Sequence, residues 1–127
     1  MTDNFDNLVE PYIKAVQGKK AFDIVALDVR KLTSYSDAII IASGNSNRQV
    51  TAIAEFIKKE LKDKGIRPYG IEGLKEGTWV LLDYVEVIIH VFYEEMRQFY
   101  DLEGFWADAR RIEIDKSDSD SRESISK

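Results

Sequence analysis

Residues 38–61 read AIIIASGNSNRQVTAIAEFIKKEL, and this stretch decides the fold. Its first five residues are all apolar, which predicts a short strand that is buried on both faces of a sheet. SGNSN (43–47) then turns the chain, and Asn45 or Ser46 can cap the helix that follows. Gly65 stands where a C-terminal cap of that helix belongs. The apolar face of the helix consists of Val50, Ile53, Ala54, Ile57 and Leu61.

The segment before this stretch predicts one more helix and one more strand. NFDNLVEPYIKAVQ (4–17) has apolar residues at helical spacing, and Gly18 follows it. Pro11 lies inside that spacing. Because proline has no backbone N–H, we expect either a kink or a late start of the helix. FDIVALDV (22–29) is a short run rich in β-branched residues, which predicts a strand.

The segment after this stretch predicts mainly strands. Residues 65–77 read as a loop with one short edge strand. WVLLDYVEVIIHVF (79–92) predicts two strands that turn near residues 83–86, although the turn lacks the Asn-Gly or Asp-Gly of a tight hairpin. EEMRQFYDLEGFW (94–106) predicts one or two helical turns.

These elements suit a single domain, because a chain of 127 residues builds one hydrophobic core. The sequence beyond Ile112 is polar and repetitive, so we expect a domain over residues 1–112 and a disordered polar tail over residues 113–127. The expected fold class is α/β (α+β), with a mixed β-sheet covered by helices.

Composition argues against several classes of protein. The chain has no cysteine, which excludes disulfides, zinc ribbons and thiol catalysis and fits a reducing compartment. No apolar run approaches the ~18 residues that a membrane span needs. The N-terminus carries Asp3, Asp6 and Glu10 and no basic region, so a secretory signal is not expected. We therefore expect a cytoplasmic protein that does not bind membranes.

The net charge of −5 is unevenly distributed along the chain. Residues 1–70 carry eleven Lys/Arg against nine Asp/Glu, whereas residues 71–109 carry two Lys/Arg against nine Asp/Glu. Such an acidic segment repels nucleic acid, so direct sequence-specific binding to nucleic acid is not expected. It attracts basic proteins and speeds their encounter. The alternative is that these acids only keep the domain soluble.

The SGNSN corner is similar to the phosphate-binding corner of nucleotidyltransferases, where backbone N–H groups at a helix start face an anion. It is not a Walker loop, because the Gly-Lys-Ser/Thr ending is missing. Nucleotidyl transfer also needs clustered carboxylates for two metal ions. The nearest candidates are Asp83 and Glu86, which flank the expected turn. A metal-dependent nucleotidyltransferase, or a nucleotide-binding protein, is therefore the alternative to a non-enzymatic role, and helix capping is the simpler explanation of the corner.

His90 is the only histidine and alternates with Ile88 and Phe92 on an expected strand. A metal site would need several carboxylates to converge on it without a cysteine or a second histidine. We therefore predict a structural, hydrogen-bonded histidine.

Aromatic residues gather near the end of the domain: six of the 14 lie between Phe92 and Trp106. Phe99, Leu102 and Trp106 fall at helical spacing and can close the core, whereas Tyr100 and Phe105 lie off that stripe. Exposed aromatics among acids are typical of a protein-docking patch. The residues alone leave a core lid and a docking patch equally open.

The sequence resembles the ribosomal silencing factors, also called the Iojap-like family. The matching blocks cover roughly residues 4–109 and read DIVALDV, SDAIIIASGNSNRQVTAIAEFI, GIEG, and WVLLDYVEVIIHVFYEEMRQFYDLEGFWADA. Two departures stand out. Tyr84-Val85-Glu86 replaces the family's usual Leu-Gly-Asp, and Phe105 stands where Leu is more common.

The resemblance implies a nucleotidyltransferase-like fold that has lost catalysis, with no cofactor and no metal. It implies binding to ribosomal protein fourteen of the large ribosomal subunit, on the face where the small subunit would join. Translation is then repressed because the subunits cannot associate. It also implies a homodimer when the protein is free.

On these blocks we predict a partner-binding set that combines acids with apolar side chains. Trp79 is expected to supply buried area, and Glu72 and Asp83 to meet Lys or Arg of the partner. The predicted residues are Glu72, Trp79, Asp83, Tyr100, Leu102 and Trp106.

Overall fold

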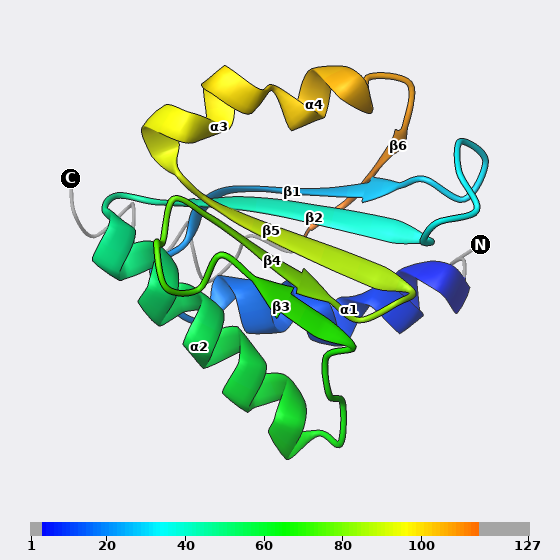
Figure 1. The fold of residues 1–127 in the computed structure, drawn as a ribbon. Coiled ribbons are helices and arrows are strands. Elements are labelled where there is room, and N and C mark those ends of the chain that lie inside the picture. Colours follow the sequence, from blue (N-terminus) through cyan, green and yellow to red (C-terminus); the bar gives the residue numbers. More distant parts are fainter. Residues whose placement is uncertain (1–3, 115–127) are drawn as a thin grey trace, which may run out of the picture.

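The computed structural model describes residues 4–114 as one six-stranded sheet with helices on both sides (Figure 1). The elements are α1 (Asn4–Gln17), β1 (Phe22–Asp28), β2 (Ala38–Gly44), α2 (Asn47–Asp63), β3 (Gly70–Glu72), β4 (Trp79–Asp83), β5 (Val87–Tyr93), α3 (Glu94–Tyr100), α4 (Leu102–Phe105) and β6 (Arg110–Ile112). No helix among these residues is long and apolar enough to cross a lipid bilayer. From residue 115 on, the predicted tail lies outside the described residues.

The sheet is mixed, as predicted, with the strand order β3-β4-β5-β2-β1-β6. β2 and β5 pair in parallel at the centre, and all other neighbours pair antiparallel. The seven residues of β2 are all buried, which confirms that this strand is covered on both faces. β6 was not predicted, because three residues with two arginines carry no strand pattern of their own. These residues form a strand because they pair with β1, which is distant in the sequence.

α2 follows the prediction closely. Ser46 is its N-cap, and its hydroxyl accepts a hydrogen bond from the Gln49 N–H at 3.1 Å. All five predicted core residues of this helix are fully buried, and Gly65 follows the helix with φ +81°.

α1 begins at Asn4 and continues through Pro11, so the late start is wrong. Proline removes one backbone hydrogen bond, but the burial of Phe5, Val9, Ile13 and Val16 favours the helix over its whole length. α1 and α2 lie side by side on one face of the sheet and cover the larger core (Figure 1).

α3 and α4 lie on the opposite face, called the outer face below (Figure 1). A second, smaller core lies under them. It contains Leu27, Val29, Ile39, Ile41 and Phe92, which are all buried. The layers are therefore helix, sheet and helix, with the outer helical layer much the shorter.

Candidate docking site

Strand alternation places three of the predicted binding residues on the outer face. Trp79 pairs with Phe92 of the second core, and Asp83 follows Trp79 at an even spacing along β4. Glu72 of β3 is paired with Leu81, which lies between these two on the same face. The sheet thus brings together residues that are eleven positions apart in the chain.

The outer face is only partly covered by α3 and α4. Over β1 and β2 the side chains of Leu27 and Ile41 are buried, whereas on β4 Trp79 and Leu81 stay partly exposed. Glu72 at the edge is exposed. A partly apolar strip of sheet therefore lies open beside the two short helices.

Trp79 joins this open strip to the core beneath it. Its indole N–H donates a hydrogen bond to His90 Nδ1 at 3.0 Å. Its ring stacks on Phe92 with centroids 5.0 Å apart and contacts Tyr100 with centroids 4.6 Å apart. Trp79 is consequently a structural residue as well as a surface one.

His90 is the structural histidine that the sequence predicted. Burial lowers the pKa of His90 from 6.5 to about 4, because the charged imidazolium is poorly solvated there. The ring is therefore neutral at pH 7, and its Nδ1 lone pair accepts the Trp79 bond.

The corner between α3 and α4 corrects the expected aromatic stripe. Asp101 has φ 48° and ψ 48°, a left-handed conformation that ends α3 and turns the chain. Residues on the two sides of Asp101 therefore do not share one helical face. Phe99 is 76% exposed and does not close the core, whereas Leu102 and Trp106 pack against the second core.

The segment consequently has both of the roles that the sequence left open. Leu102 and Trp106 face inward, whereas Phe99, Tyr100 and Phe105 are exposed, Phe99 and Phe105 at 76% each. Phe99 and Phe105 were not among the predicted binding residues. Asp101 is the sequence feature that could have indicated their exposure. Asp adopts left-handed φ more readily than most residues, so it can interrupt a helical stripe.

An ion pair fixes this corner from within. Arg97 is buried, and its Nε and Nη2 atoms donate to the two carboxylate oxygens of Glu103 at 2.9 and 3.0 Å. Its Nη1 atom donates to the Ser43 hydroxyl at 2.8 Å. The Arg97 hydrogen bond lowers the pKa of Glu103, so the pair stays ionised at neutral pH.

Negative charge dominates the surface of residues 71–109. Of the two cations in this segment, Arg97 is buried and paired, and Lys75 is exposed. The exposed acids are Glu72, Glu76, Glu86, Glu94, Glu95, Asp101 and Asp108. A basic partner suits this surface better than an acidic one.

The β2–α2 corner and the β4–β5 turn carry structural contacts. Asp83 Oδ1 accepts the Val85 N–H at 2.8 Å, so this carboxylate stabilises the turn. Within residues 4–114 no three His, Cys, Asp or Glu side chains are arranged to hold a metal ion. The carboxylates needed for nucleotidyl transfer are thus not assembled in the described part of the chain.

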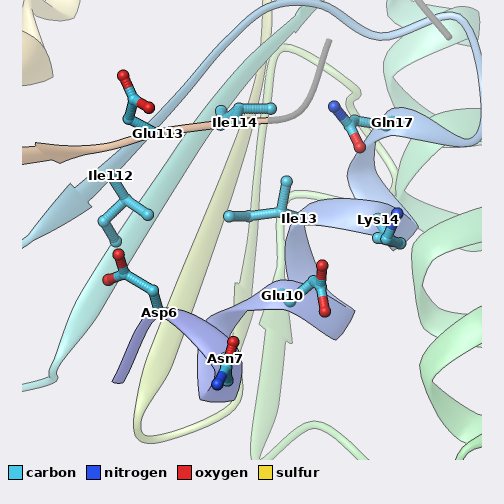
Figure 2. Close-up of a pocket in the computed structure, with 9 residues that line it drawn as sticks. All are labelled: Asp6, Asn7, Glu10, Ile13, Lys14, Gln17, Ile112, Glu113 and Ile114. Atoms are coloured by element: carbon cyan, nitrogen blue, oxygen red, sulfur yellow. The ribbon is translucent and has the colours of Figure 1, made fainter. Parts of the chain in front are cut away.

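A groove lies on the other side of the molecule, between α1 and the end of β6. Figure 2 shows the side chains of Ile13, Ile112 and Ile114 beside Asp6 and Glu10. Its volume is about 160 Å³, which is small beside the ~300–1,000 Å³ of ligand pockets. The outer face therefore remains the better candidate site.

Known proteins resemble this chain over most of its length. A protein-family model described as ribosomal silencing factor during starvation matches residues 2–127. The ribosomal silencing factor RsfS of Halalkalibacterium halodurans is 38% identical over 108 residues, covering 85% of this chain and 92% of that protein. The RsfS protein of Bacillus subtilis is 41% identical over 101 residues, covering 80% and 86%. A crystal structure of a Chromobacterium violaceum protein superimposes with a TM-score of 0.75 at 38% identity, covering 84% of this chain and 88% of that one.

Proposed function

Because this chain belongs to the family of ribosomal silencing factors, we propose that it represses translation by binding the large ribosomal subunit. The family consists of ribosome-binding factors and not of enzymes. Repression of this kind needs no chemistry. A protein bound where the small subunit joins excludes that subunit by its volume alone.

The partner on the large subunit is ribosomal protein fourteen, and the outer face is the surface that binds it. Exposed aromatic rings with exposed acids near them in the chain support this assignment, because aromatic anchors supply most binding energy and acids attract a basic ribosomal protein. A face of this kind can bury the ~800 Å² per partner of a standard interface. In the free protein the same apolar surface would favour a homodimer.

The binding residues have distinct roles in this proposal. Glu72 and Asp83 meet cations of the partner, and Tyr100 offers an exposed ring beside Trp79. Leu102 and Trp106 lie partly buried beneath the surface and contribute mainly by supporting it. We add Phe99 and Phe105, whose exposure makes them the better aromatic anchors.

The proposal also covers two broader features. It includes a nucleotidyltransferase-like fold without the catalytic carboxylates, and action of the protein in the cytoplasm. Incubation with labelled nucleotides and Mg²⁺ separates this role from nucleotidyl transfer, since only an enzyme would incorporate label.

The single observation that carries the proposal is the exposure of Phe99 and Phe105 in a segment rich in exposed acids. The test is sedimentation of purified small and large subunits with and without the protein. We expect fewer joined ribosomes and co-sedimentation with the large subunit alone. Undiminished joining at saturating protein would refute the proposal.

Two aromatic variants show which surface is used. Phe99→Ala should relieve the block on subunit joining and weaken binding by roughly thirtyfold, as for a central anchor of about 2 kcal/mol. Tyr35→Ala is the matched control, because Tyr35 is 86% exposed on the loop between β1 and β2 and is not one of the proposed binding residues. Equal effects of the two variants would contradict the assignment of the face.

A further inference from the structure

The arrangement of the α3–α4 corner depends on few contacts. α4 has only four residues, none of them buried, and a helix this short is not stable by itself. Leu102 and Trp106 hold the corner against the second core, but apolar burial is not directional and does not fix an orientation. Hydrogen bonds within the corner, such as that from the Gly104 N–H to the Asp101 carboxylate at 3.2 Å, fix its local turn but do not reach the sheet. A further directional contact is therefore needed to orient Phe99 and Phe105 relative to the sheet.

Arg97 supplies directional contacts to both sides of this corner. Its guanidinium meets the Glu103 carboxylate in a bidentate fork, which constrains the geometry of α4 relative to α3. Its third bond reaches Ser43, which is 1% exposed and lies on the central strand β2. The corner is thus tied to the fully buried central strand β2 through one side chain.

We infer that Arg97 is a positioning residue for the docking site: by joining Glu103 to Ser43 it holds the α3–α4 corner in the arrangement that exposes Phe99 and Phe105 to a partner. This inference rests on the proposed function and extends it to a residue that the partner does not touch. The Arg97 side chain is only 10% exposed, so it has no room for a direct contact.

The consequence is a specific kinetic expectation. If the corner samples other arrangements without its tether, only a fraction of molecules is ready to bind, and apparent affinity falls by that fraction. This loss of affinity appears as a slower association rate. Removal of a side chain that contacts the partner directly, such as Phe99, mainly raises the dissociation rate. Glu103 is 32% exposed and could touch a partner cation itself, so the decisive variants are made at Arg97.

The experiment compares Arg97→Lys and Arg97→Gln with Asp28→Asn. Asp28 bridges Arg30 and Arg110 on the face that carries α1, so its variant removes a comparable ion-pair network on the other side of the sheet. For each protein we would measure thermal stability, binding kinetics on purified large subunits, and amide hydrogen exchange of residues 99–106. Arg97→Lys keeps the positive charge but cannot form the bidentate contact with Glu103. It provides a second test of the tether if Arg97→Gln does not fold.

We expect both Arg97 variants to bind about tenfold more weakly through slower association, with faster exchange confined to residues 99–106. Asp28→Asn should lower stability without changing the binding rates. Wild-type rates in both folded Arg97 variants, a loss confined to dissociation, or an equal loss in Asp28→Asn would overturn the inference. If the wild-type protein itself does not bind large subunits, the proposed function is refuted and this inference with it.

Discussion

At the scale of single residues, His90 links the core to the candidate docking site, because its neutral ring accepts the Trp79 indole bond. Protonation occupies the acceptor nitrogen and therefore breaks this bond. The pKa of His90 is about 4 in the folded protein and near 6.5 in an unfolded chain. The unfolded state thus binds the proton more readily, so stability is fully present above pH 6.5 and falls as pH drops toward 4.

The first prediction follows from this difference. Between pH 7 and pH 5 the free energy of unfolding should fall by about 2 kcal/mol, as measured by urea denaturation. His90→Asn keeps an acceptor but does not titrate in this range, so its stability should change little over the same interval. Since His90 is the only histidine, a parallel fall in both proteins would show that another group is responsible.

Val85 is the second residue whose conformation is informative. It has φ +71°, a region that β-branched residues rarely adopt, and it is 55% exposed. The resemblance implied a glycine at this position, and the departure explains why the turn could not be predicted in detail. The Asp83 carboxylate holds the Val85 N–H and helps to maintain the strained backbone.

The second prediction is that Val85→Asn stabilises the protein by about 1 kcal/mol, because Asn tolerates the left-handed region better. Val85→Thr is the control, since it keeps the β-branched shape and the strain and should unfold at nearly the wild-type urea concentration. An Asn variant less stable than the Thr variant would show that the Val85 side chain makes contacts that matter more than the strain.

At the scale of elements, β3 depends on a glycine that follows it. Gly73 has φ +83°, and a Cβ placed there would overlap the backbone carbonyl of Trp79. Gly70, at the start of the same strand, has open space around its Cα and no positive φ. The two glycines of GIEG are thus unequal, although the sequence presents them alike.

The third prediction uses this pair. Gly73→Ala should lower stability by more than ~2 kcal/mol, because both the backbone conformation and the packing against β4 are lost. Gly70→Ala should stay within about 0.5 kcal/mol of wild type. Thermal unfolding of the two variants checks this, and similar losses in both would contradict the role of Gly73.

Elements with a local pattern were predictable, and those defined by distant contacts were not. α2 combines a cap, five core residues at helical spacing and a terminal glycine, and the structure confirms each of them. β6 exists only because β1 lies beside it, and α1 passes through Pro11 because its apolar face is buried. In the site, the sheet register collects Glu72, Trp79 and Asp83 on one face, which spacing along the chain does not reveal.

At the scale of the whole molecule, the sheet separates two unlike surfaces. The larger core and the two long helices lie on one side and supply most of the buried apolar side chains. The outer side has the two short helices and the exposed rings of Phe99 and Phe105, and exposed acids such as Glu94, Glu95 and Asp108 lie near them in the chain. If the outer face binds the partner as proposed, most of the stability and the recognition reside on opposite faces, and the Trp79–His90 pair contributes to both.

The fourth prediction concerns this charge. Raising salt from ~50 to ~200 mM should slow association with the large subunit markedly, because charges farther apart than a Debye length of about 10 Å are screened. Dissociation should change less, since packing of the aromatic rings governs it. The double variant Glu94→Gln and Asp108→Asn removes two exposed acids that lie on either side of the exposed rings in the chain, and it should weaken the salt dependence of the association rate. Truncation after Ile114, which packs on the larger core, should leave that dependence almost unchanged, because residues 115–127 carry four acids and three bases. A salt dependence that survives the two neutralisations but vanishes on truncation would assign the attraction to the C-terminal residues instead of the outer face.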